Sequence, residues 1–384
     1  MTGGLAPLGC PGCGTRLDPG DPAVHLGCPA CRAAGTPVNL VCLLDPQRVA
    51  RAFDRPPDRR AGVWAWADAL PVPARYGSPL GEGGTPLVAA PRLGAALGVP
   101  GLLVKNEAAN PTWSHKDRLA ALAVAAARAL GADTVTAASS GNHGVAVGAY
   151  AARAGLRCVL FTVAGLPAPM AGLLRSYGAE VVEAETPEHR YDLMGEGIRR
   201  GWFPAGNAAL PPVGSSPYGV DGYKTLAYEL WADLGGRAPD LVVLPVAYGD
   251  LAAGLYRGFA DLRAAGRIGG LPRLVGAEVT GALGRGLAGG PAPVPRRRTA
   301  AFSINTSHTA RQAVEAIRAT GGTALTVPEQ ALAESRRLLA CTEGLVAEAS
   351  SCAAVAAAGP AATGLPEGAV AVVVLTSSGL KDVC

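Results

Sequence analysis

Short apolar runs alternate with longer amphipathic or alanine-rich stretches through most of the chain. The apolar runs are rich in Val and Leu and bounded by Gly or Pro, which is typical of strands buried on both faces of a parallel sheet. We predict strands at 101–106, 133–139, 157–163, 180–184, 241–246, 273–279 and 369–376. Helices are predicted at 117–130, 145–154 and 169–178, between the first four strands. This alternation predicts an α/β fold in which helices cover parallel sheets.

Residues 44–80 lack such a pattern. They are rich in Pro, Arg and Asp and include the stretch RPPDRRAG. Clusters of this kind are typical of connecting segments. We therefore predict a linker here.

Composition narrows the class of protein. The chain is 49% hydrophobic, with a mean hydropathy of +0.23, so its 384 residues can bury a large core. The net charge is +4, and the one dense basic run, at 296–298, is too short to indicate nucleic-acid binding. The N-terminus lacks the charged and apolar regions of a secretory signal, and no apolar run is long enough to span a membrane. We expect a cytoplasmic protein with neither nucleic-acid nor membrane partners.

Four cysteines near the N-terminus have metal-ligand spacing. Cys10, Cys13, Cys28 and Cys31 form C-x2-C-x14-C-x2-C, as in a zinc ribbon. Two disulfides would suit a secreted module, and they fit poorly with the missing signal. Because four thiolates close the coordination shell, we expect a structural zinc. The remaining cysteines lack ligand spacing and are expected mostly to be small buried hydrophobes: Cys42, Cys158, Cys341, Cys352 and Cys384.

Four polar loops follow predicted strands, where α/β folds bind ligands. They are NPTWSHKDR (110–118), SSGNHG (139–144), PVAYGD (245–250) and TSSGLKD (376–382). The first places Lys116 at a helix N-terminus, where the macrodipole disfavours cations. A functional lysine there, a glycine-containing loop for a phosphate and hydroxyl-rich loops together indicate a phosphorylated carbonyl cofactor held as a Schiff base.

These loops carry a family resemblance, together with EGGTPL (82–87), DGYKTLAYEL (221–230) and EASSCAAVAA (348–357). In this order they resemble the threonine synthase-like branch of the fold-type II, tryptophan synthase β-like, pyridoxal phosphate (PLP) enzymes. The resemblance implies two parallel-sheet α/β domains with the cofactor between them, a small zinc-ribbon-like module and a homodimer. The expected parts are the module at 1–45, a large domain at 46–118 and 205–384, and a smaller mobile domain at 119–204.

The resemblance also implies roles for individual residues. Lys116 would form the Schiff base and move protons at substrate carbons. Asn142 would bind the cofactor ring hydroxyl, Thr376 the ring nitrogen, and the amides of the 247–249 loop the phosphate. The cofactor-binding set is therefore Lys116, Asn142, Ala247, Tyr248, Gly249, Asp250 and Thr376. The substrate-binding set is Ser139, Ser140 and His143.

Departures from the family pattern bear on the reaction. The family's substrate-phosphate segment carries an arginine where this chain has Gly219, and Asn and Ser where it has Val213 and Gly214. His143 replaces a threonine linked to γ chemistry, and Asp250 places an acid beside the expected phosphate. Losing a bidentate guanidinium weakens an anion site substantially. The pattern favours reaction at the β carbon.

We therefore expect a PLP-dependent carbon–oxygen lyase or synthase, diverged from threonine synthase, that eliminates or replaces a group at the β or γ carbon of a small amino acid. Two alternatives stay open. One is a threonine synthase acting on O-phosphohomoserine, with the missing charge supplied by His115, His143, Arg153 or Lys224. The other is a serine or threonine ammonia-lyase. Intact Lys116, Asn142 and Thr376 argue against a PLP-binding protein without activity.

Overall fold

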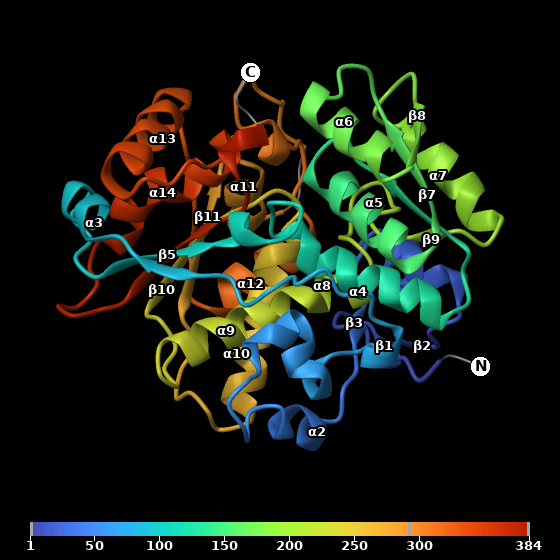
Figure 1. The fold of residues 1–384 in the computed structure, drawn as a ribbon, viewed down its shortest axis with the longest axis horizontal. Coiled ribbons are helices and arrows are strands. Elements are labelled where there is room, and N and C mark those ends of the chain that lie inside the picture. Colours follow the sequence, from blue (N-terminus) through green and yellow to red (C-terminus); the bar gives the residue numbers. More distant parts are fainter. Residues whose placement is uncertain (1–2, 291–292, 382–384) are drawn as a thin grey trace. The chain divides into compact units, whose positions relative to one another are not determined.

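The computed structural model describes residues 3–290 and 293–381, whose contacts group into two compact units (Figure 1). The first contains Met1–Gly83 and Lys116–Thr225, and the second contains Gly84–His115 and Leu226–Cys384. Asp382 and Cys384, named above, lie outside the described residues. The units differ from the domain ranges predicted above because helix α4 (Lys116–Ala129) and the segment before residue 225 pack within the first unit.

The second unit is built on a six-stranded sheet in the order β12-β11-β10-β13-β5-β4. All pairs are parallel except β4–β5. The strands are β4 Leu87–Ala89, β5 Leu102–Asn106, β10 Leu241–Pro245, β11 Arg273–Glu278, β12 Thr323–Thr326 and β13 Ala371–Leu375. Its helices are α3 Pro91–Leu97, most of α9 Lys224–Asp233, α10 Asp250–Ala264, α11 Ala282–Ala288, α12 Arg311–Ala319, α13 Glu329–Glu343 and α14 Ala349–Ala362. Strands β10 and β13 are buried along their whole length, as continuous apolar runs predict.

The first unit contains a four-stranded parallel sheet in the order β8-β7-β6-β9. Its strands are β6 Thr134–Ala138, β7 Arg157–Thr162, β8 Glu180–Glu183 and β9 Phe203–Pro204. Helices α5 (Asn142–Ala154) and α7 (His189–Arg199) pack on this sheet, and α4 and α6 (Ala168–Ser176) pack on α5. A short helix, α8 (Pro217–Val220), packs against α4.

The N-terminal residues of the same unit form a small antiparallel sheet in the order β2-β1-β3. Its strands have two residues each: β1 Leu8–Gly9, β2 Arg16–Leu17 and β3 Val41–Cys42. Helix α1 (Pro29–Ala33) begins directly after Cys28, the first cysteine of the second pair. We call residues 3–45 the four-cysteine module.

The predicted linker at 44–80 is wrong. This stretch contains helix α2 (Pro46–Arg51) and a kinked 3-10 segment (Arg59–Ala69). Val63 and Trp66 are almost completely buried. Proline and arginine are frequent in this segment, but several of its apolar residues are buried, and their burial holds the segment against the first unit.

The predicted α/β class is confirmed, and each predicted strand and helix is present with shifts of a few residues at its ends. Pattern analysis missed the short strands β4, β9 and β12, which have two to four residues. None of the helices in the described part of the chain is long and apolar enough to cross a membrane.

Candidate active site

The loop before Lys116 is bonded to the loop that follows β13. The N–H of His115 donates to the carbonyl of Thr376 at 2.8 Å. The carbonyl of Trp113 accepts from the Ser378 N–H at 3.0 Å and from the Ser377 hydroxyl at 3.1 Å. Within the second unit, these bonds fix the residue that directly precedes Lys116.

A buried carboxylate shapes the start of this loop. Glu107 is fully buried and accepts from the Thr85 hydroxyl at 2.6 Å and from Asn110 Nδ2 at 2.9 Å. Asn110 Nδ2 also donates to the Glu107 carbonyl. Through Glu107, these bonds join Thr85 of the motif EGGTPL to Asn110 of the motif NPTWSHKDR.

Lys116 is the first residue of α4, in the first unit. Its Nζ lies 5.8 Å from the centroid of the Tyr223 ring, within range of a cation–π contact. Arg118 is completely buried and donates to the Thr225 hydroxyl at 2.8 Å, so it is no solvated surface charge. A Cβ on Gly222 would lie 2.1 Å from the Arg118 carbonyl, so only glycine lets the two segments approach this closely.

A series of hydroxyls leads away from Thr376 in the second unit. Thr376 Oγ1 lies 2.8 Å from Ser351 Oγ, which accepts from the Ser377 N–H at 3.0 Å. The Ser377 hydroxyl also lies 2.9 Å from Glu348 Oε1, so its single proton is shared between this carboxylate and the Trp113 carbonyl. Thr376, Ser351, Ser377 and Glu348 are all buried. Either hydroxyl of the Ser351–Thr376 pair can donate to the other, so this bond ties Thr376 to the buried hydroxyls of Ser351 and Ser377.

The N-terminus of α10 can receive an anion. Gly249 precedes this helix with a φ of +86°, and a Cβ there would lie 2.1 Å from the Ala313 Cβ. Glycine is therefore required for the turn that presents the amides of Ala247 to Gly249. Asp250, the first residue of α10, accepts at Oδ1 from Gln312 Nε2 on α12 at 2.6 Å.

The N-terminus of α5 carries the second polar loop. Ser139 Oγ accepts from the Gly144 N–H at 3.1 Å and from the Gly141 N–H at 3.3 Å, which leaves its own proton for a ligand. Ser140 Oγ pairs with Thr162 Oγ1 at 2.7 Å. Both ring nitrogens of His143 are buried, and the ring lies so near Gly206 that a Cβ there would be 2.8 Å from Nε2.

The segment before α8 is buried and partly unpaired. The N–H groups of Val213 and Gly214 donate to Asn207 Oδ1 at 3.0 and 3.3 Å. The buried Ser216 hydroxyl has no hydrogen-bond partner among the described residues. A Cβ on Gly219 would lie 3.0 Å from Leu119 Cγ, so the packing leaves little room for a side chain there.

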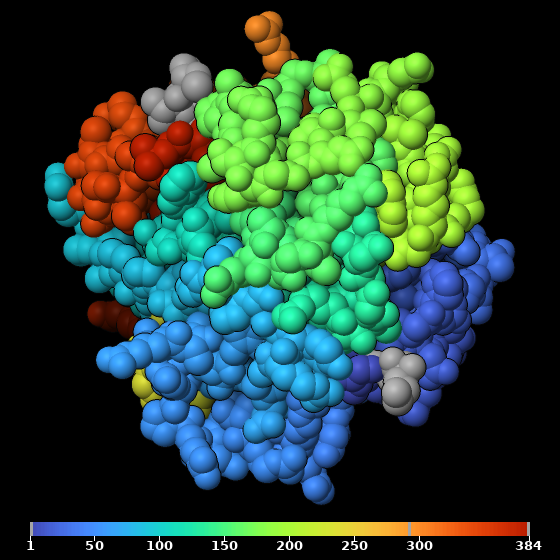
Figure 2. Space-filling model, turned by 45° about the vertical axis from the view of Figure 1, so that its right-hand side comes forward, coloured from blue at the N-terminus to red at the C-terminus, as the bar shows by residue number. Residues whose placement is uncertain are grey.

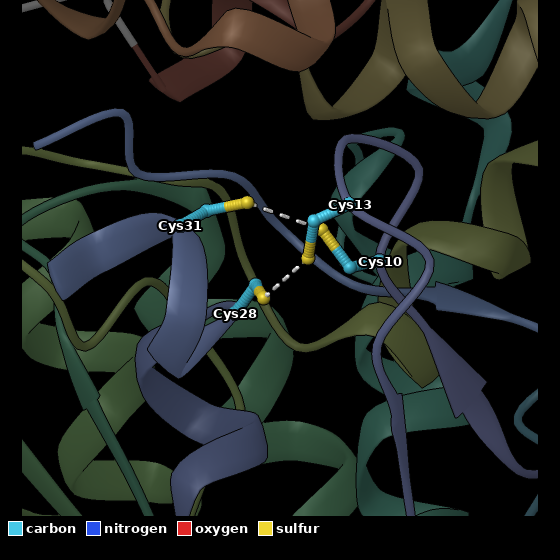
Figure 3. A group of neighbouring side chains, drawn as sticks. All are labelled: Cys10, Cys13, Cys28 and Cys31. Atoms are coloured by element: carbon cyan, nitrogen blue, oxygen red, sulfur yellow. Dashed lines mark hydrogen bonds between the residues drawn. The ribbon is translucent and has the colours of Figure 1, made fainter. Parts of the chain in front are cut away.

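The four N-terminal cysteines form one cluster (Figure 3). Their sulfurs all lie within 4.8 Å of one another, and the pairs Cys10–Cys31 and Cys13–Cys28 are separated by 3.6 and 3.5 Å. A tetrahedral zinc with Zn–S bonds of about 2.3 Å places sulfurs about 3.8 Å apart. The cluster therefore fits a four-thiolate metal site. Hydrogen bonds from Thr15 lower the pKa of the Cys13 thiol, which favours the thiolate that a metal needs.

Comparison with known families decides the class of protein. The family described as "Pyridoxal-phosphate dependent enzyme" matches residues 79–377. The chain belongs to this family. The match covers the loops described above as far as Ser377 and excludes the four-cysteine module.

Similar proteins define the branch of the family more closely. Threonine synthase from Methanocaldococcus jannaschii is 32% identical over 341 residues, covering 84% of this chain and 82% of the relative. The crystal structure of an O-ureido-L-serine synthase matches with a TM-score of 0.63 at 26% identity, covering 80% of this chain and 91% of that one. A threonine deaminase from T.th. matches with a TM-score of 0.62 at 27% identity, covering 87% of this chain and 97% of that one. The chain is a threonine synthase-like, fold-type II PLP enzyme.

The candidate residues fall into two sets. Lys116, Ser139, Ser140, Asn142 and His143 belong to the first unit, and Ala247, Tyr248, Gly249, Asp250 and Thr376 belong to the second. Sequence reasoning did not single out Tyr223, Ser351 or Ser216, although each lies within or beside a motif noted for the resemblance. Their burial and contacts depend on the tertiary structure.

Proposed function

We propose that the chain uses PLP, bound covalently to Lys116, to eliminate or replace a group at the β or γ carbon of a small amino acid. The observation that carries the proposal is the position of Lys116. It begins a buried helix within a family-specific motif, directly after a residue bonded to the Thr376 loop. The other lysines, Lys105, Lys224 and Lys381, are buried, and the first two are engaged in ion pairs.

The residues present fit PLP. The Gly249 turn and the α10 N-terminus suit its phosphate, and the Thr376 hydroxyl, which lies beside Ser351 Oγ, would bond the ring nitrogen. Asn142, at the start of α5, would donate to the ring hydroxyl oxygen. PLP, when bound, supplies an electron sink for charge that develops at the substrate α carbon.

The protein's own groups would then position the substrate and move protons. The Ser139 hydroxyl and the first amides of α5 would bind the substrate carboxylate. The Lys116 amine, once released, would take a proton from the α carbon and return one to the product. The Tyr223 ring beside this amine would limit its motion. A hydroxyl rather than a carboxylate at Thr376 would leave the ring nitrogen unprotonated.

The packing at Gly219 supports a substrate other than a phosphorylated one. A side chain there would meet Leu119, and no arginine takes its place in the motif. The nearby Ser216 hydroxyl suits a neutral polar group better than a dianion. We therefore favour reaction at the β carbon of a hydroxy or substituted-hydroxy amino acid.

Two other functions have specific support. Similarity to the Methanocaldococcus jannaschii protein over most of both chains supports a threonine synthase. Similarity to the T.th. threonine deaminase over 97% of that chain supports an ammonia-lyase.

Mapping the attached lysine tests the mechanism separately from the substrate. Borohydride reduction of the PLP-loaded protein, followed by peptide mass spectrometry, should place the cofactor on the peptide that contains Lys116. Lys116→Ala should lose both this adduct and the visible absorbance of the bound cofactor. An adduct on Lys105, Lys224 or Lys381, or full activity in Lys116→Ala, would contradict the proposal.

Substrate assays then separate the three functions. L-Serine, L-threonine and O-phospho-L-homoserine are each incubated with the loaded enzyme. Ammonia and a 2-oxo acid indicate elimination, and equal amounts of phosphate and threonine indicate threonine synthase. We expect turnover of a serine or threonine derivative and little phosphate release.

A further inference from the structure

The four-cysteine module packs directly on the segment before α8. Asn39 Nδ2 donates to the Ser215 carbonyl at 3.0 Å, and both residues are buried. The Tyr218 hydroxyl donates to the Ala6 carbonyl at 3.1 Å. We call residues 213–219 the α8 loop. Hydrogen bonds at Ser215 and Tyr218 thus join this loop to N-terminal residues that lie far away in sequence.

These contacts begin next to the metal ligands. The Cys28 N–H donates to the Val38 carbonyl at 2.9 Å, and Val38 precedes Asn39. Gly27 has a φ of +76°, and a Cβ there would lie 2.6 Å from the Val38 carbonyl and 3.3 Å from the Val213 side chain. A shift of Cys28 therefore displaces the groups that touch Val213 and Ser215.

The module is also anchored on the four-stranded sheet. The His25 and Phe203 rings meet edge to face at 5.1 Å, and Leu26 packs on a cluster that includes Phe161 and Met194. In Figure 2 the dark blue N-terminal residues lie directly against the yellow-green segment around β9. These contacts attach the module to the sheet. The module can therefore hold the α8 loop in place relative to β9 through Asn39.

The far side of the α8 loop reaches the helix of Lys116. Gly219 packs on Leu119, and Gly222 packs on the Arg118 carbonyl, both in the first turn of α4. Within the first unit, a continuous path of contacts therefore runs from Cys28 through the α8 loop to the residues just after Lys116.

We infer that the metal-bound four-cysteine module positions the α8 loop, and with it the Ser216 hydroxyl, for recognition of the substrate side chain. The substrate part of this inference rests on the proposed function. The strands of the module have only two residues each, so a four-thiolate metal would supply much of its rigidity. Loss of the metal then loosens the α8 loop before it unfolds the rest of the protein.

Hydrogen exchange tests the inference without any turnover. Zinc-loaded protein and protein stripped with a chelator are compared by exchange mass spectrometry, with metal content measured by atomic emission. Amides at 213–216 should exchange at least about 10-fold faster after stripping, while those in β10 change less than about twofold. Unchanged exchange at 213–216, or equal acceleration in β10, would overturn the inference. Purified protein that takes up no zinc would overturn it as well.

Single substitutions separate the contact from the metal. Asn39→Ala removes the bond to Ser215, and Tyr218→Phe removes only the hydroxyl that bonds Ala6. Both should keep full zinc content and speed exchange at 213–216 by about 3-fold or more. Asp45→Ala is the matched control, because it removes a cap of α2 in the same region without touching the α8 loop. Equal behaviour of all three variants would contradict a specific positioning role.

Turnover adds a second readout once a substrate is known. With whichever of L-serine, L-threonine or O-phospho-L-homoserine reacts, Asn39→Ala should raise KM about 5-fold and leave kcat within about twofold. A fall in kcat at constant KM would overturn the substrate part of the inference. If none of the three reacts, the proposed function fails, and the exchange data still decide whether the module holds the loop.

Discussion

Replacing Lys105 with methionine tests how strongly a buried ion cluster stabilises the second unit. The Lys105 side chain is completely buried, with Nζ 2.9 Å from Glu229 Oε2 and 3.1 Å from Asp233 Oδ2. It also donates to the Thr85 carbonyl at 2.7 Å. Methionine fills the space but leaves two carboxylates without their cation.

The expected loss is large. Removing one partner of a buried ion pair costs about 3–5 kcal/mol, and the bond lost at the Thr85 carbonyl adds about 1 kcal/mol. For a chain of this size, each kcal/mol shifts Tm by about 1.2 °C, so Lys105→Met should melt roughly 5–7 °C lower. The measurement is scanning calorimetry of the PLP-saturated protein.

Two comparisons show whether the ions are the cause. Adding Glu229→Gln and Asp233→Asn to Lys105→Met should restore roughly half of the lost Tm, because the carboxylates no longer need a cation. Arg157→Met breaks an exposed pair with Glu180, whose side chains are 55% and 52% exposed, and should cost below about 1 kcal/mol. If Lys105→Met melts within about 2 °C of the parent, the reasoning is refuted.

Three further predictions concern single residues. Trp113 has a φ of +61°, so Trp113→Gly should be about 1 kcal/mol more stable than Trp113→Ala, and equal melting of the two would count against backbone strain. Ser351→Ala should shift the 15N resonance of labelled PLP's ring nitrogen, because Thr376 Oγ1 loses a hydrogen-bond partner; an unchanged resonance would argue against the hydroxyl series. Burial lowers the pKa of His25 to about 4 from 6.5. Since the neutral form is favoured on folding, stability is lost as the pH falls below 6.5. Between pH 7 and 5 the parent should lose about 1–2 kcal/mol more than His25→Phe in urea unfolding, and parallel losses would contradict this.

The sheets were the most predictable part of the fold. Runs such as 241–246 are apolar at every position, and only a strand covered on both faces accommodates such a run at that length. The four-cysteine spacing likewise predicted the sulfur cluster, because the ligand geometry of zinc constrains sequence distance. The short strands β9 and β12 were not predicted because they contain too few residues to show the two-residue period of a strand.

Tertiary contacts explain what the pattern missed. Trp66 lies in the short run GVWAWADAL, whose burial was missed because Pro- and Arg-rich stretches flank it and it shows no strand or helix period. The neighbourhood of Lys116 and Tyr223 arises because Gly222 lets the 221–225 segment approach α4. The roles given to Asn142, the 247–249 amides and Thr376 stay predictions from the family resemblance. The structure adds their local bonding.

The order in which the chain visits its two units restricts how the protein can be taken apart. The backbone passes from one unit to the other three times, after residues 83, 115 and 225. Neither unit is therefore a continuous segment, and no truncation or single proteolytic cut can release one intact. Exchanging a unit between relatives would require three junctions. One of these is the peptide bond that joins His115 to Lys116, so chimeras would cut directly beside the lysine proposed to hold the cofactor.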